Sequence, residues 1–168
     1  FILGTKEMSL EELTKLYLGL ANYGELAGIS YLRDENLSVK AQMFSKGSAY
    51  LTLETMRELK RVGVEEFNQK DKIVSWKTGT SYGRKDAWAL GATPRYTLGV
   101  WVGNFTGEAN ANLYGVSVAG ELFFELLGLL DDTNEEFRAS DDLMTLKIDS
   151  ATGYRYDLPV NSSFTSYP

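Results

Sequence analysis

The sequence predicts an α+β fold, in which an antiparallel sheet packs against helices. Three observations carry this prediction. Apolar residues recur at intervals of three and four residues in the first part of the chain, which is the period of an amphipathic helix. From Lys72 the period changes to that of a strand, and two β-rich runs then flank a short turn. A helical period returns after residue 116.

The first helix is expected to begin after Ser9. Ser9 and Glu12 have the S-x-x-E spacing of a capping box, in which each side chain accepts from a free amide of the first turn. Gly24 stands where a helix commonly ends in a left-handed residue. The apolar stripe of this helix consists of Leu10, Leu13, Leu16, Tyr17, Leu20 and Ala21.

A second helix is expected from Ser45 or Lys46 to Arg61, with an apolar stripe at Ala49, Leu53, Met56 and Leu59. Residues 28–37 are expected to be irregular or a short strand. Residues 59–71 contain a glycine and many charges, which is typical of a connector.

The strands follow. Ile73, Val74 and Trp76 are β-formers that lead into a lysine motif. Residues 87–92 and 96–102 are expected to form a hairpin around a turn that contains Pro94. The second run is almost continuously apolar, so we expect it to be a central strand of its sheet.

Residues 103–116 are rich in glycine, asparagine and alanine and are expected to be a loop. Ser117 is expected to open a last helix with a broad apolar face. Residues 131–142 are acidic and are expected to be a solvated linker. Residues 146–148 and 153–156 are expected to form a small hairpin, followed by a frayed tail.

The composition limits the chemistry that the chain can carry out. Its 168 residues are the length of one domain, which buries roughly 70% of the surface that the unfolded chain exposes. The sequence has no cysteine and no histidine. It therefore excludes disulfides, thiolate or imidazole metal sites and a Ser-His-Asp triad, and we expect no metal ion and no other cofactor. Any acid–base group must be a lysine, a carboxylate or a tyrosine.

Charge is distributed unevenly along the chain. The sequence has 17 basic and 23 acidic residues, a net charge of −6, which argues against nucleic acid as a partner. Residues 70–86 nevertheless contain five basic and two acidic side chains. This segment is either a solvated loop or a local seat for an anionic group. The sequence has no run of 18 apolar residues, the length that a membrane-spanning helix requires.

The residues Lys77, Thr78, Gly79 and Thr80 suit the binding of a peptide C-terminus. A strand edge offers backbone N–H and C=O groups to an extended peptide, and a glycine lets that peptide approach closely. An ammonium group and two hydroxyls can hold a carboxylate. The Thr80 amide can also point at a carbonyl oxygen that becomes an oxyanion during acyl transfer.

The longer stretch WKTGTSYGRKDAWALGATPRYTLGVWVGN, which begins at Trp76, resembles the third motif and the following strands of the penicillin-binding transpeptidases. The similarity is strongest to the bifunctional penicillin-binding proteins of the 1C type. The segment MSLEELTKLYLGLANYG is similar to the helix that precedes this motif in the family. The resemblance extends over about residues 3–130, and it implies a partial penicillin-binding protein or serine β-lactamase-like transpeptidase fold.

The resemblance also implies roles for the motif. Lys77 orients the hydrogen-bond network of the active site and the substrate carboxylate. Thr78 and Thr80 contact that carboxylate, the Thr80 amide forms half of the oxyanion hole, and Gly79 keeps the strand edge open. Trp76 and Trp88 belong to the wall of the site in the family, while ordinary core packing is the alternative for both.

One departure from the family concerns the nucleophile. No serine in this sequence is followed three residues later by a lysine, and no S-x-N triplet occurs. The family has both motifs upstream of the helix at Ser9. We therefore expect residues 1–142 to be the C-terminal part of a transpeptidase domain and residues 143–168 to be a tail or the start of a further domain. This fragment alone is expected to be inactive, because its serines have no activating base.

For the whole protein the resemblance implies a serine-type DD-transpeptidase that cross-links peptidoglycan stem peptides ending in D-Ala-D-Ala and binds β-lactams. It also implies an upstream glycosyltransferase domain, the missing N-terminal part as a partner, and a location at the extracytoplasmic face of the bacterial membrane (periplasm), held there only by an upstream anchor. Two alternatives stay open. One is a noncatalytic peptide-binding or scaffold module that uses the same strand edge. The other is a serine β-lactamase fragment, which the tryptophan-rich extension disfavours.

Overall fold

The computed structural model of the chain describes residues 6–32, 41–57, 72–130, 135–155 and 165–167. Its helices are α1 (Leu10–Ala21), α2 (Lys46–Arg57), the π-helix η1 (Gly115–Gly120) and α3 (Glu121–Leu129). Its strands are β1 (Glu25–Leu26), β2 (Ala41–Gln42), β3 (Ser75–Thr80), β4 (Asp86–Ala92), β5 (Thr97–Gly103), β6 (Leu146–Ile148) and β7 (Thr165–Tyr167).

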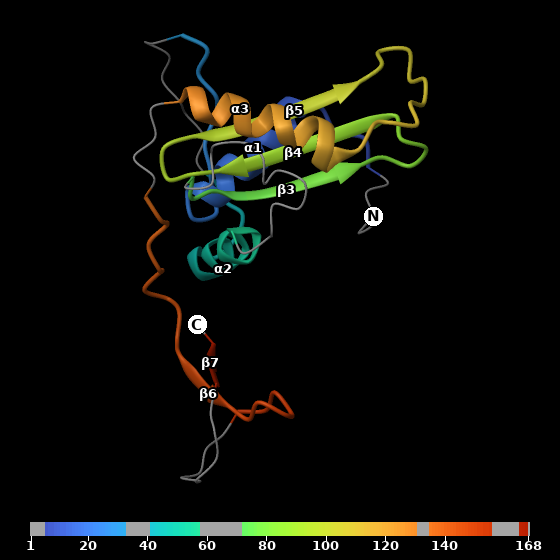
Figure 1. Cartoon of the computed structure of the whole chain (residues 1–168). Helices are drawn as coiled ribbons and strands as arrows, with labels where there is room; N and C mark the ends of the chain where they lie inside the picture. Colours follow the sequence, from blue (N-terminus) through green and yellow to red (C-terminus); the bar gives the residue numbers. More distant parts are fainter. Residues whose placement is uncertain (1–5, 33–40, 58–71, 131–134, 156–164, 168) are drawn as a thin grey trace.

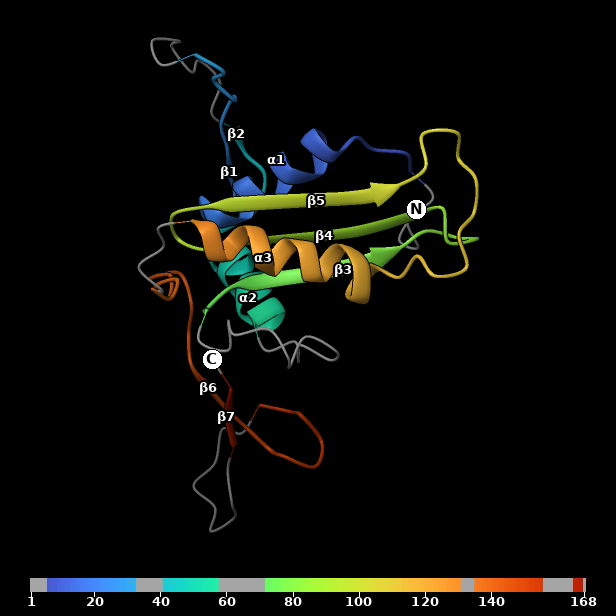
Figure 2. The same ribbon diagram turned by 45° about the horizontal axis from the view of Figure 1, so that its top comes forward.

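A three-stranded antiparallel sheet in the order β3-β4-β5 lies at the centre of the fold. Helix α3 covers the face that is in front in Figure 1, and α1 covers the opposite face. Helix α2 packs against the first part of β3 (Figures 1 and 2). The predicted α+β fold with an antiparallel sheet is confirmed.

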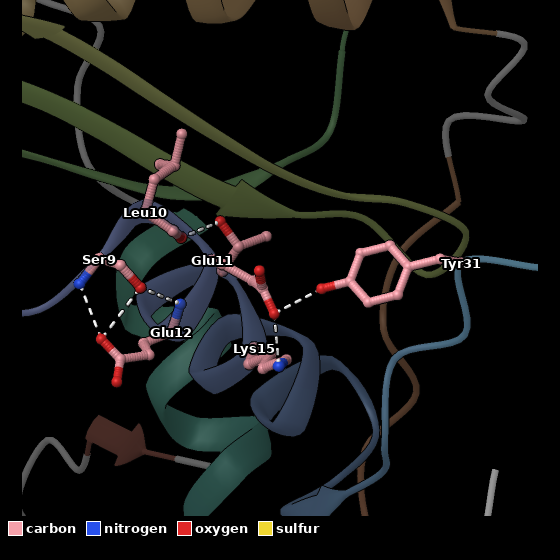
Figure 3. A network of polar contacts seen from close by, with 7 residues as sticks. Ser9, Leu10, Glu11, Glu12, Lys15 and Tyr31 are labelled. Atoms are coloured by element: carbon pink, nitrogen blue, oxygen red, sulfur yellow. Dashed lines mark hydrogen bonds and ion pairs between the residues drawn. The ribbon is translucent and has the colours of Figure 1, made fainter.

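The predicted start of α1 is also confirmed, and Figure 3 shows the polar network around it. The Ser9 backbone N–H and hydroxyl donate to a Glu12 carboxylate oxygen at 2.8 and 3.0 Å, and the Glu12 N–H donates to the Ser9 hydroxyl at 3.2 Å. In the same first turn, Glu11 accepts from Lys15 and from the Tyr31 hydroxyl, both at 2.6 Å. The network thus closes the first turn of α1 and holds residue 31 beside it.

We expect Ser9→Ala to lower the free energy of unfolding by about 1 kcal/mol, or the melting temperature by about 2–4 °C. The Ser9 backbone N–H and hydroxyl hold the pKa of Glu12 below its usual value. The contribution of the Glu12 carboxylate is therefore present above the unfolded pKa of about 4.3 and is lost as the pH falls through the folded pKa, while the bond from the Glu12 N–H to the Ser9 hydroxyl does not titrate. Thermal unfolding at neutral and acidic pH measures both effects. Ser117→Ala, at an exposed position of η1, is the control; an equal loss in both variants would contradict a role for the cap.

Helix α1 ends where the sequence predicted. Tyr23 and Gly24 both adopt positive φ angles of 54° and 85°, and the Gly24 N–H donates to Gly19 O at 2.8 Å. A Cβ at Gly24 would overlap the Phe44 carbonyl oxygen, so the close approach of the next segment also requires glycine. Helix α2 begins at Lys46 as expected. The expected end of α2 at Arg61 and the connector 59–71 lie outside the described residues.

The hairpin of β4 and β5 forms within one residue of its predicted limits, and Trp88 lies opposite Trp101. The prediction that the second run is a central strand is wrong within the described sheet, where β4 is central. The continuous apolar pattern of β5 has another cause, because both of its faces are covered. A Cβ at Gly99 would overlap Thr14 of α1, while Val100 packs in the core under α3.

The last helix begins two residues earlier than predicted, and it begins as a π-helix. Gly115, Ala119 and Gly120 are its buried residues, and the α-helical turns of α3 follow directly. Phe123 of α3 is fully buried and stacks on Trp76 with ring centroids 6.3 Å apart. The core between the sheet and α3 contains Val74, Trp76, Ala87, Ala89, Val100, Leu113, Ala119, Phe123, Phe124 and Leu127.

Residues 135–143, called the strap below, contact α2 and the segment that follows α1. The Tyr23 hydroxyl donates to Arg138 O at 3.0 Å and accepts from Arg138 N at 3.1 Å, and the Phe137 ring meets the Tyr23 ring edge-on. Asp142 accepts from the Gly47 N–H of α2 at 3.0 Å. Most described residues of 131–142 are exposed, as expected for a solvated linker, but the segment also contacts Tyr23 and α2, which the prediction did not include.

The C-terminal hairpin also differs from its prediction. Strand β6 lies where expected, but it pairs with β7, while Arg155 forms an isolated bridge to Ile148. Residue 156 of the expected partner lies outside the described residues. This hairpin lies apart from the three-stranded sheet in both views (Figures 1 and 2). None of the helices in the described ranges has the length and apolar character that a membrane crossing needs.

Candidate functional site

The K-T-G motif (Lys77, Thr78 and Gly79) and the following Thr80 form the last four residues of β3, which is an edge strand of the described sheet. Lys77 lies opposite Leu90 of β4, and Gly79 lies opposite Trp88. The half of β3 that contains the motif extends beyond α2 (Figures 1 and 2). Lys77, Gly79 and Thr80 are exposed, so this part of the strand edge is open to solvent.

The side chains of β3 alternate between two environments, as the pleat of a strand requires. Trp76, Thr78 and Thr80 face η1 and α3, because the first two lie beside Gly120 and the third bonds to Gly115. Lys77 and Gly79 face the other way. The motif therefore presents its ammonium group and its glycine on one face of the strand and its hydroxyls on the other.

Lys77 is the exposed cation of the strand. Its Nζ donates to the carbonyl oxygen of the neighbouring Thr78 at 2.6 Å. An ammonium group has three donors, so this bond leaves donors for a carboxylate. The interaction also keeps the ammonium group close to the strand rather than extended into solvent.

Gly79 has room on its open face. A Cβ added there would meet a single atom within 4 Å, Trp88 Cβ at 3.9 Å, which is an ordinary contact. Its φ angle is not positive either. Among the described residues, neither packing nor backbone conformation thus requires glycine at this position. A ligand that approaches the backbone closely would require it.

Thr80 is tied to the start of the last helix. Its Oγ1 accepts from the Gly115 N–H at 2.9 Å, a contact between residues 35 positions apart. A Cβ at Gly115 would overlap the Gly79 carbonyl oxygen. Sequence analysis missed Gly115 and assigned it to a loop. The only sequence signal was a glycine directly before a helical period, which does not indicate what the glycine contacts.

The two tryptophans beside the motif differ. Trp76 is buried and packs against Phe123 and Phe124, so the core-packing alternative holds for it. Trp88 is half-buried and belongs to a row of rings with Trp101 and Phe105, with centroids 6.3 and 5.4 Å apart. The Trp101 indole N–H donates to Asp86 at 2.9 Å, which orients this row beside the open face of Gly79.

The turn after β3 contains the local excess of basic residues. Ser81 closes this turn, because its Oγ accepts from the N–H groups of Lys85 and Asp86. The Arg84 guanidinium donates to Ala111 O at 2.7 Å and lies 4.5 Å from the centre of the Tyr114 ring. Arg84 therefore joins the turn to the loop before η1. Arg84 stays exposed, so these contacts do not decide between a solvated loop and a seat for an anionic group.

A separate pocket of about 440 Å³ lies at the end of β5. Its wall contains Val102, Gly103, Asn104, Glu108, Ala109, Asn110, Ala111 and Leu113. None of the K-T-G residues lines it. The candidate site is therefore a strand edge rather than this pocket.

Penicillin-binding protein 1C of Escherichia coli K12 is 30% identical to the chain over 129 residues, which are 77% of this chain and 17% of that protein. The chain is related to the penicillin-binding proteins. The resemblance that the sequence suggested is thereby confirmed. The chain spans about a sixth of the length of this relative. No protein-family model matches the chain.

Two solved structures of penicillin-binding proteins share the fold. Penicillin-binding protein 1A from Haemophilus influenzae superposes with a TM-score of 0.68 at 14% identity, over 95% of this chain and 32% of that chain. PonA1 from Mycobacterium tuberculosis superposes with a TM-score of 0.63 at 21% identity, over 98% of this chain and 47% of that chain. At such identities the superpositions establish the fold alone.

Proposed function

We propose that the chain is the part of a penicillin-binding transpeptidase domain that binds the stem peptide along β3. The observation that carries this proposal is Gly79, which is exposed on an edge strand and has open space where a side chain would lie. An extended peptide can add to such an edge through its backbone, provided that no side chain separates the two chains. The relationship to penicillin-binding proteins supports the same reading.

The motif recognises an anionic peptide terminus. Lys77 supplies a positive charge beside the strand, and the hydroxyls of Thr78 and Thr80 can donate to a carboxylate. These are charge-assisted hydrogen bonds, which are stronger than bonds between neutral groups. The substrate is therefore a peptide with a free C-terminal carboxylate, and a stem peptide ending in D-Ala-D-Ala has this chemistry. A β-lactam with a carboxylate beside its strained amide binds in the same way.

The reaction is acyl transfer through a serine. A serine Oγ attacks the carbonyl carbon between the two D-alanines, and its proton passes to a base. The C–N bond then breaks, the terminal D-alanine leaves with a proton on its nitrogen, and an acceptor amine later takes the acyl group from the serine. The Thr80 N–H donates to the oxyanion that forms on the attacked carbonyl oxygen. Because no S-x-x-K motif occurs in these 168 residues, the serine and its base come from another segment of the protein.

The proposed division of the chain has residues 1–142 in the transpeptidase domain and residues 143–168 in a tail or further domain. It is supported by Asp142, which still bonds to α2, whereas the β6–β7 hairpin beyond it lies apart from the sheet (Figure 1). In the whole protein we propose a glycosyltransferase domain upstream, an upstream membrane anchor and a location outside the cytoplasmic membrane. These features are those that the sequence resemblance to the bifunctional 1C-type proteins implies.

Labelling with fluorescent penicillin tests the proposal. We expect the full-length protein to form a covalent adduct and the 168-residue chain alone to form none, because the chain has no activated serine. A denaturing gel detects the adduct, and mass spectrometry of its peptides locates the serine. A stoichiometric adduct on the 168-residue chain would contradict an external nucleophile. Reversible binding without an adduct in the full-length protein would instead favour the noncatalytic peptide-binding module.

A further inference from the structure

Gly115 holds the K-T-G strand from behind. It is the first residue of η1 and is buried against the face of β3 that bears Thr78 and Thr80. A Cβ at this position would overlap the Gly79 carbonyl oxygen and lie 3.0 Å from its carbon and 3.2 Å from the Gly79 nitrogen. The helix backbone therefore rests directly on the Gly79 peptide, on the face of β3 that bears the threonine side chains.

The second contact is a hydrogen bond with a defined direction. The Gly115 N–H can only donate, so the Thr80 hydroxyl oxygen is the acceptor at 2.9 Å. A hydroxyl that accepts through its oxygen still has its own hydrogen to donate. The bond thus fixes the side-chain rotamer of Thr80 and leaves one donor, the type of group that a carboxylate requires.

The π-helix makes both contacts possible. A π-turn within a helix is rare and is often found at functional sites. Here its buried residues are all small, namely Gly115, Ala119 and Gly120, so the helix backbone can approach the strand. A helix that began in the usual way with a larger residue would stand further from β3.

We propose that Gly115 is a positioning residue for carboxylate recognition: its backbone supports the Gly79 peptide and orients the Thr80 hydroxyl toward the bound carboxylate. This inference rests on the proposed transpeptidase function. Gly115 does not touch the substrate itself. It acts through Gly79 and Thr80.

Gly115→Ala in the full-length protein tests the inference. The added methyl displaces the Gly79 peptide or the helix by a distance on the order of 1 Å, which can cost about 100-fold in rate. We expect the second-order rate constant of acylation by benzylpenicillin to fall about 100-fold. Gly120→Ala is the matched control, because a Cβ there has its nearest neighbours at 3.5 Å, an ordinary distance, and its rate is expected to stay within about twofold of the wild type.

A second readout separates positioning from a general loss of structure. The methyl ester of benzylpenicillin lacks the carboxylate, so the ratio of the two acylation rates measures carboxylate recognition. We expect this ratio to fall in Gly115→Ala and to stay at the wild-type value in Gly120→Ala. An equal fall in both rates, with an unchanged ratio, would show a structural effect only and would overturn the inference, as would an unchanged benzylpenicillin rate.

Variants of Thr80 provide a test that does not depend on the folding of Gly115→Ala. If Gly115→Ala does not fold, Thr80→Val and Thr80→Ser test the same link, because valine removes the hydroxyl and serine keeps it. We then expect a lower ratio in the valine variant alone, and equal ratios would overturn the inference.

If the wild-type protein itself is not acylated, the proposed function fails and the inference fails with it. Acylation of the wild type with no response in these variants overturns the inference and leaves the function standing.

Discussion

Lys77→Ala in the full-length protein is expected to lower the rate of acylation by penicillin about 100- to 1,000-fold. In the proposed site the ammonium group is a preorganised charge beside the peptide-binding strand, and removal of such a group typically costs this much. Stopped-flow or quenched labelling at several penicillin concentrations measures the rate. Because Lys77 is exposed and its one described partner is a neighbouring carbonyl, the free energy of unfolding is expected to change by less than about 0.5 kcal/mol.

Lys85→Ala provides the matched control for charge. Lys85 is an exposed lysine in the turn after β3, so its removal changes the net charge of the same region without touching the strand. We expect its acylation rate to remain near that of the wild type. Unchanged acylation in Lys77→Ala would remove Lys77 from the site, and an equal loss in both variants would point to general charge attraction rather than to a specific contact.

The largest effect on stability is expected from Phe123→Ala. The Phe123 side chain is 0% exposed and packs against Trp76 and Phe124, with ring centroids 6.3 and 5.3 Å apart. Its ring also fills the space over Gly91 of β4, where a Cβ would lie 2.6 Å from Phe123 Cζ. Removal of the ring leaves a cavity between α3 and the sheet, and such substitutions cost about 3–5 kcal/mol.

Thermal or denaturant unfolding measures this loss. Leu129→Ala in the same helix is the control, because Leu129 is 82% exposed and its truncation is expected to change the stability by less than about 0.5 kcal/mol. A loss below 1 kcal/mol in Phe123→Ala would contradict the position of α3 on the sheet. The position matters for the site as well, since α3 continues η1 and so determines where Gly115 meets β3.

The elements that sequence analysis placed well are those with local signals. The capping box at Ser9 determines the start of α1 through contacts within one turn. The hairpin around Pro94 and the strand that contains the K-T-G motif follow from runs of β-formers and from turn residues between them. The candidate site was identified in the same way, because its four residues are consecutive.

The parts that could not be predicted depend on contacts between distant residues. The bond between Gly115 and Thr80 joins two separate elements, and no local pattern indicates it. The central position of β4 is also a property of the assembled sheet, since a strand covered on both faces and a strand between two neighbours have the same apolar pattern. The contacts of the strap with Tyr23 and α2 could not be predicted either, because an acidic composition indicates exposure to solvent and does not indicate a partner.

The strap has a mechanical consequence. It leaves α3 on one side of the sheet and is fastened to the helices beyond it, through Tyr23 at the end of α1 and through Arg57 and Gly47 of α2. Tension applied to the C-terminal hairpin would therefore be borne by α1 and α2 before it reached α3. The Gly115 contact behind the K-T-G strand is thus shielded from any load that arrives along the tail.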